Sequence, residues 1–176
     1  AMYGRNGECP MAVVAAQSPS DCFYAAFEAC KIALEHMVPV ILLSDGYIAN
    51  GSEPWKIPDL DSLPDIKSRK VKEAKDFSPY NHDDSKLARP WAIPGLSGME
   101  HRIGGLEKSD NSGHVSYDEE NHSHMVKLRQ RKVDIISNSL DEISPYGDNS
   151  GDLVVVGWGG TYGAIRSAVN KSWEEG

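Results

Sequence analysis

The 176-residue sequence has no apolar run long enough to cross a membrane and no excess of basic residues. Its 18 Lys and Arg residues against 26 Asp and Glu residues give a formal net charge of −8. This balance argues against nucleic acid or an anionic membrane surface as the main partner. Cysteine is also scarce, and Cys9, Cys22 and Cys30 form no CxxC pair, so iron–sulfur and structural zinc sites lack their usual spacing. Three cysteines without a disulfide pattern predict reduced thiols and a cytoplasmic protein.

Several signatures of catalytic and metal chemistry are absent as well. Neither GxSxG nor HExxH occurs, and no cysteine stands in a Cys/His nucleophile context. His122 and His124 lie two residues apart in an expected helix, so their side chains should point to different faces. We therefore expect no metal ligands in this chain.

The most clearly patterned stretch is the apolar run 38–43, VPVILL, which predicts a strand buried on both faces of a parallel sheet. A short strand over 11–16 precedes it, and Ser18 is placed to cap a helix that ends before Pro39. Strand, helix and strand in this order predict a right-handed βαβ crossover. The helix should bury one stripe of side chains, made of Phe23, Phe27, Cys30, Leu34 and Met37.

The remainder of the chain alternates irregular and regular segments. Residues 56–97 contain five prolines and should wrap the domain in an extended form. Ser116 and Glu119 have the spacing of a capping box, which predicts a helix to about Leu140. After a Pro- and Gly-containing linker at 145–151, the run 153–156 predicts a strand, and Thr161 should cap a helix that ends near residue 173. The chain is thus expected to be α/β, with a second α/β unit beginning near residue 151.

Three polar positions are candidates for chemistry. The glycines of 157–163 (GWGGTYG) follow a predicted strand as in a phosphate loop, but tight strand–helix packing explains them as well. Asp45 follows the predicted strand 38–43, at the edge where ligands gather in α/β sheets, although a turn-stabilising role is the simpler interpretation. Arg5 stands in a glycine-rich loop, where its guanidinium could hold a carboxylate bidentately or simply face solvent.

Taken together, six blocks of the sequence resemble the α subunits of 2-oxoglutarate:ferredoxin oxidoreductases, which are thiamine-diphosphate-dependent 2-oxoacid:acceptor oxidoreductases. The blocks follow one another in the order of that family and span nearly the whole chain. They are GRNGE (4–8), PVILLSDG (39–46), ANGSEPW (49–55), ARPW (88–91), EHRIGG (100–105) and GWGGTYG (157–163).

The resemblance implies a partial fold and a shared active site. Residues 1–147 would be the C-terminal part of a parallel-sheet pyrimidine-binding domain, and 151–176 the start of a transketolase C-terminal-like α/β domain. Thiamine diphosphate with Mg²⁺ and a [4Fe-4S] cluster would be held mainly by a partner β subunit. The activating glutamate would lie before residue 1, so this fragment should contain no catalytic residue and be inactive alone.

The resemblance also implies an activity. Arg5 matches the arginine that holds the 2-oxo acid's carboxylate, and His101 with Arg102 is a weaker candidate for a second substrate loop. The reaction would be the oxidative decarboxylation of 2-oxoglutarate to succinyl-CoA, a step of the tricarboxylic acid cycle, with coenzyme A as co-substrate and ferredoxin as electron acceptor. Two alternatives are the same chemistry on pyruvate or a branched-chain 2-oxo acid, and a non-catalytic module that only assembles subunits.

Overall fold

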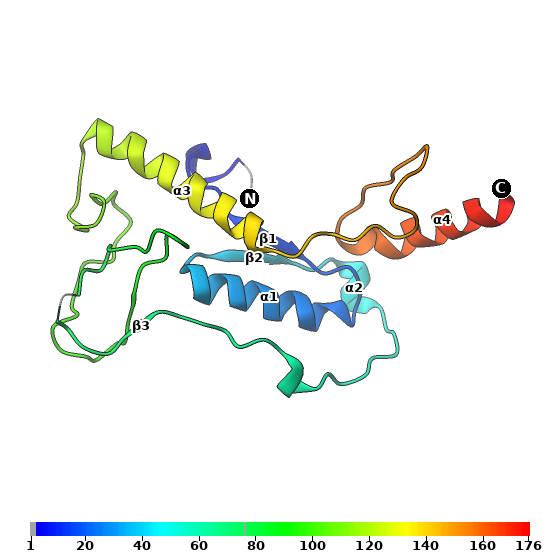
Figure 1. The fold of residues 1–176 in the computed structure, drawn as a ribbon, viewed down its shortest axis with the longest axis horizontal. Helices are drawn as coiled ribbons and strands as arrows, with labels where there is room; N and C mark the ends of the chain where they lie inside the picture. The colour runs from blue at the N-terminus through cyan, green and yellow to red at the C-terminus, as the bar shows by residue number, and fades with distance from the viewer. Residues whose placement is uncertain (1–2, 76) are drawn as a thin grey trace. The chain divides into compact units, whose positions relative to one another are not determined.

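The computed structural model describes residues 3–75 and 77–176, and the described chain forms two compact units. The first unit consists of residues 3–12, 31–40, 65–75 and 77–140, and the second of residues 13–30, 41–64 and 141–176. Figure 1 shows the elements in chain order. No helix among the described residues is long and apolar enough to cross a membrane.

The second unit contains most of the strand–helix–strand segment. Strands β1 (Ala12–Ala15) and β2 (Val40–Leu43) are neighbours in a two-stranded sheet, and helix α1 (Asp21–His36) connects them. The Ser18 hydroxyl accepts a hydrogen bond from the Asp21 amide at 3.3 Å, so the predicted helix start is confirmed. The core of this unit comprises Ala16, Ala25 and Ile48, with Val14 and Cys22 packed against it.

Two predictions for this segment are wrong in detail. Strand β2 is not buried on both faces, because Leu42 and Leu43 are 42% and 43% exposed in a sheet of only two strands. The buried stripe of α1 is also rotated from the predicted one, since Cys30 and Leu34 are exposed. The residues that are buried follow helical spacing, and two of the four are alanines: Ala25, Ala29, Ile32 and His36. Selecting the largest apolar residues therefore identified the wrong face.

The C-terminal part of the second unit corrects two further predictions. Residues 153–156 form no strand, and all four side chains are at least half exposed, because no described strand pairs with them. A 3-10 turn, η3 (Gly159–Thr161), leads into helix α4 (Tyr162–Glu175). Thr161 does not cap α4 with its side chain, and its hydroxyl instead donates to the carbonyl of Trp158 at 3.1 Å. The short helix α2 (Gly46–Asn50) and the turn η2 (Leu60–Ser62) complete this unit.

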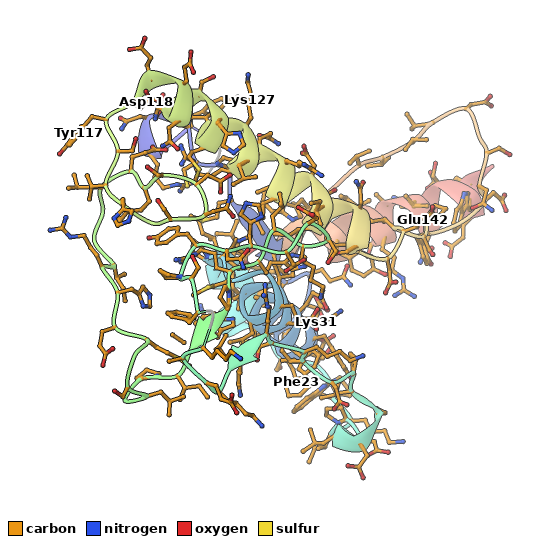
Figure 2. The ribbon with its side chains drawn as sticks, turned by 60° about the vertical axis from the view of Figure 1, so that its left-hand side comes forward. Phe23, Lys31, Tyr117, Asp118, Lys127 and Glu142 are labelled. Carbon is orange, nitrogen blue, oxygen red and sulfur yellow. The ribbon has the colours of Figure 1, made fainter. Side chains whose placement is uncertain are left out.

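The first unit is largely irregular apart from one long helix. Strands β3 (Lys70–Val71) and β4 (Trp91–Ala92) form a two-residue parallel pair in the proline-containing segment. Helix α3 (Glu119–Ser139) has Leu140 as its C-cap, in agreement with the predicted end near Leu140. Its N-cap is Asp118, whose carboxylate accepts the Asn121 amide at 2.7 Å, and not Ser116, whose hydroxyl accepts the Asp118 amide. Figure 2 shows Asp118 at the start of α3.

Candidate functional site

The loop that carries Arg5 has an unusual backbone. Residues Arg5–Gly7 form a 3-10 turn, η1, closed by a bond from the Gly7 amide to the Gly4 carbonyl at 3.0 Å. Arg5, Asn6 and Gly7 have φ values of 53°, 62° and 72°, which lie in the left-handed region. Non-glycine residues adopt this region at a cost and mostly where surrounding structure imposes it. The sequence analysis predicted a glycine-rich loop here but not a run of left-handed residues.

The Arg5 side chain is exposed and oriented by its own loop. Its Nε donates to the Cys9 carbonyl at 3.1 Å, and Nη2 donates to the same oxygen. A guanidinium has donors on two edges of a planar fork, and the Cys9 carbonyl takes one edge. This geometry fixes the plane of the fork, which is what bidentate recognition of a carboxylate requires.

The weaker candidates, His101 and Arg102, lie in a second loop of the same unit. His101 Nδ1 lies 2.8 Å from the carbonyl of Met99, and its ring meets the ring of Phe77 edge-on with the centroids 5.6 Å apart. Arg102 is exposed. One of these contacts lies within the loop and the other is with Phe77 of a different segment, and a role for His101 or Arg102 toward a substrate stays a prediction.

The histidines pair with carboxylates. His82 Nε2 and His124 Nε2 approach the two oxygens of Asp110 at 3.1 and 2.8 Å. His122 lies between Glu107 and Glu8, and these two carboxylates raise its pKa. Within residues 3–75 and 77–176, no group of three or more His, Cys, Asp or Glu side chains could hold a metal ion.

A cavity in the first unit was not foreseen from the sequence. It measures about 300 Å³, and α3 forms one wall with Met125, Leu128, Lys132 and Ile136. Burial, followed by the nearby charge of Arg89, lowers the pKa of Lys132 to about 8. The signal available in the sequence was the spacing of Lys132, which is four residues from both Leu128 and Ile136 on an apolar helix stripe.

The glycine loop at 157–163 lies against Asp45 in the second unit. Asp45 caps α2 by accepting the Ile48 amide at 2.8 Å, so its predicted turn-stabilising role is confirmed. A Cβ atom added at Gly160 would lie 2.0 Å from a carboxylate oxygen of Asp45, and one added at Gly157 would meet Ile165. The glycines thus permit close packing, and an adjacent carboxylate disfavours a bound phosphate. Glu53, the other carboxylate near this strand end, accepts the Ser20 amide at 2.6 Å.

Comparison with known proteins places this fold in a family. The family model for pyruvate flavodoxin/ferredoxin oxidoreductase, thiamine-diphosphate-binding, matches residues 1–121. The chain belongs to this oxidoreductase family. The resemblance seen in the six sequence blocks is confirmed, and so is the α/β fold of a thiamine-diphosphate-binding domain.

The chain is similar to three known proteins, two by sequence and one by structure. It is 52% identical over 177 residues to the 2-oxoglutarate oxidoreductase subunit KorA of Mycobacterium tuberculosis, and the match covers 100% of the chain and 27% of KorA. It is 25% identical to the α subunit of 2-oxoacid:ferredoxin oxidoreductase 1 of Aeropyrum pernix, over 99% of the chain and 28% of that subunit.

The third relative is a solved structure, the 2-oxoglutarate:ferredoxin oxidoreductase of Magnetococcus marinus with 2-oxoglutarate, coenzyme A and succinyl-CoA bound. The TM-score is 0.84 at 24% identity, over 99% of this chain and 30% of that one, and it establishes the common fold. The chain thus spans under a third of the length of each of these relatives.

The described glycine loop does not fit the diphosphate of thiamine diphosphate, the group named for this family. The glycine loop at 157–163 faces the Asp45 carboxylate and carries no basic residue. No described acidic cluster could bind a divalent cation.

Proposed function

We propose that this chain is part of the α subunit of a 2-oxoacid:ferredoxin oxidoreductase that converts 2-oxoglutarate to succinyl-CoA and passes electrons to ferredoxin. The 52% identity to KorA over the whole chain carries this proposal. The substrate assignment follows the name of that relative and the 2-oxoglutarate bound in the structural neighbour. The three cysteines are free thiols, which agrees with a cytoplasmic location.

In this proposal the chain contributes a substrate-binding wall and no redox group. Thiamine diphosphate with Mg²⁺ and a [4Fe-4S] cluster would be bound mainly by a β subunit, since no described residues fit them. Coenzyme A would enter as co-substrate, as its presence in the structural neighbour suggests. The domain division near residues 147–151 also belongs to the proposal.

Arg5 would bind the carboxylate of the 2-oxo acid. The bond to the Cys9 carbonyl orients its fork, and the left-handed loop projects the side chain to the surface of the unit. A charge-assisted bidentate pair of this kind positions a substrate for reaction at another centre.

The test uses the intact α/β complex with thiamine diphosphate, Mg²⁺ and coenzyme A, and follows reduction of a low-potential dye with a panel of 2-oxo acids. Arg5→Ala should lower kcat/KM for 2-oxoglutarate roughly 100-fold, because a charged hydrogen-bond pair is lost. Arg5→Lys should recover part of that loss. Arg102→Ala is the matched variant in the second loop.

Each outcome has a distinct meaning. A preference for pyruvate or a branched-chain 2-oxo acid would change the assigned substrate and would leave the assigned reaction class unchanged. Unchanged turnover in Arg5→Ala, together with a weaker complex, would favour the non-catalytic assembly module. A complex that binds its cofactor and cluster but oxidises no 2-oxo acid would overturn the enzyme assignment.

A further inference from the structure

Two side chains of α3 hold the segment that follows Arg5. Arg129 Nε donates to the backbone carbonyl of Glu8 at 2.9 Å, and His122 Nε2 lies 3.4 Å from the Glu8 carboxylate. His122 and Arg129 are seven residues apart, so they lie on one face of the helix about two turns from each other. Glu8, the C-cap of η1, is thus contacted twice by α3.

Glu107 completes the arrangement from a third segment. Its Oε2 lies 3.0 Å from His122 Nδ1, and its Oε1 is 3.5 Å from Arg129 Nη1. Oε1 is buried and accepts no hydrogen bond, so the ion pair with Arg129 is important for that oxygen. We call Glu8, Glu107, His122 and Arg129 the α3 clamp.

The loop needs such external support. Arg5 and Asn6 both have left-handed backbone angles without being glycine, and this conformation lasts only where contacts outside the loop stabilise it. Its own turn and the bond from Arg5 to the Cys9 carbonyl are contacts local to this segment. The α3 clamp joins the end of this loop to a helix of 21 residues.

We propose that His122 and Arg129 are positioning residues that hold the Gly4–Glu8 loop, so that Arg5 meets the substrate carboxylate in one orientation. This inference rests on the proposed function of Arg5. Neither clamp residue touches substrate in this scheme. Loosening the α3 clamp lowers the fraction of molecules with Arg5 correctly placed, and this raises KM for the 2-oxo acid more than it changes kcat.

The geometry makes the α3 clamp sensitive to pH. Both ring nitrogens of His122 face carboxylates, and a neutral imidazole has only one N–H to donate, so the complete arrangement requires the imidazolium. The hydrogen bond to Glu107, then that to Glu8, raises the pKa of His122. The contribution is therefore full below the ordinary range of histidine and is lost as pH rises through the raised pKa. Among the residues that the structure describes, the neighbouring titratable groups include Arg129, which pairs with Glu107, and three that line the same cleft as His122: Tyr117, Asp118 and Glu119.

The test uses the intact α/β complex and the dye assay, with Arg129→Gln, His122→Asn and the control Arg131→Gln. Arg131 is exposed on the same helix. Arg129→Gln should raise KM for 2-oxoglutarate about tenfold with kcat within about twofold, since one charged hydrogen bond is removed. Arg131→Gln should match the wild type. For the wild type KM should rise between pH 6 and 9, and His122→Asn should flatten that rise.

A double-mutant cycle separates this inference from the proposed function. If the α3 clamp acts through Arg5, Arg129→Gln should cause no further loss in an Arg5→Ala background. Two outcomes would overturn the role of the α3 clamp and keep that of Arg5. One is additive losses in the double variant, and the other is an unchanged KM in both clamp variants while Arg5→Ala is impaired. An unimpaired Arg5→Ala enzyme would overturn the proposed role of Arg5 and the clamp's role with it.

Hydrogen exchange gives a readout that does not depend on activity. Amides of residues 4–8 should exchange faster in Arg129→Gln than in Arg131→Gln. Equal protection in the two variants would show that α3 does not hold the loop. If Arg129→Gln does not assemble, the pH profile and the loop exchange of His122→Asn decide the question, because this side chain is half exposed and tolerates replacement.

Discussion

Replacing Lys132 with methionine should stabilise the surroundings of α3 at neutral pH. Burial, and then the charge of Arg89, lowers the pKa of Lys132 from 10.5 to about 8, with Asp83 acting in the opposite direction. A pKa difference of this size means that keeping Lys132 charged in the folded protein lowers the free energy of unfolding by roughly 3 kcal/mol. Methionine keeps a flexible apolar stem next to Leu128 and Ile136 and carries no charge.

The sign of the pH dependence follows from the two pKa values. Between pH 8 and 10.5 the unfolded chain holds a proton on Lys132 that the folded chain has released, so stability rises with pH in this range. The advantage of the methionine variant is therefore largest below about pH 8. It declines toward zero as the pH approaches 10.5, the value for the unfolded chain.

Hydrogen exchange of the α3 amides in the intact complex measures this advantage as a change in local opening. After correction for intrinsic exchange, Lys132→Met should slow opening by up to roughly 300-fold at pH 7 and roughly 30-fold at pH 9. Lys127→Met is the control, since Lys127 is exposed and projects from the outward face of α3 in Figure 2. Equal opening of Lys132→Met and wild type at pH 7, or a gain that does not shrink at pH 9, would refute the reasoning.

Two smaller perturbations test the helix ends. Asp118→Ala removes the N-cap of α3 and should cost about 1 kcal/mol of local stability, seen as faster exchange in the first turn of α3, whereas Asp118→Asn should cost less. Gly160→Ala places a methyl group against the Asp45 carboxylate and should displace this cap of α2, at a cost of about 1 kcal/mol in the exchange of α2 amides. Gly163→Ala, which meets nothing within 4 Å, is its control, and equal effects would contradict the close approach.

Local signals in the sequence were sufficient where a single element decides the structure. The start of α1 at Ser18 and the end of α3 at Leu140 follow from capping chemistry and periodicity, which depend only on neighbouring residues. The choice of Ser116 as the α3 cap failed because the helix begins two residues later: Asp118 accepts the Asn121 amide, whereas Ser116 accepts the Asp118 amide outside the helix.

Tertiary properties were harder to obtain from the sequence. The run 153–156 has the composition of a strand, but a strand also needs a partner, and no partner is among the described residues. Lys132 acquires its lowered pKa only in the folded chain, where burial and then the charge of Arg89, a residue distant in sequence, act on it. The position of Arg5 in its loop was recognised, whereas the contacts of Arg129 and His122 with Glu8, more than 110 residues away, left no local trace.

The exposed segment Leu153–Val156 makes the isolated chain a poor candidate for study by itself. Its four residues are 82%, 78%, 52% and 88% exposed, they lie in no helix or strand, and they include neither proline nor a charged residue. Unpaired apolar segments of this kind add readily to the edges of other sheets and seed ordered aggregates. Purified without the rest of the oxidoreductase, the 176-residue chain should associate with itself through this segment. A lack of activity in such a preparation could therefore result from aggregation as well as from missing catalytic groups.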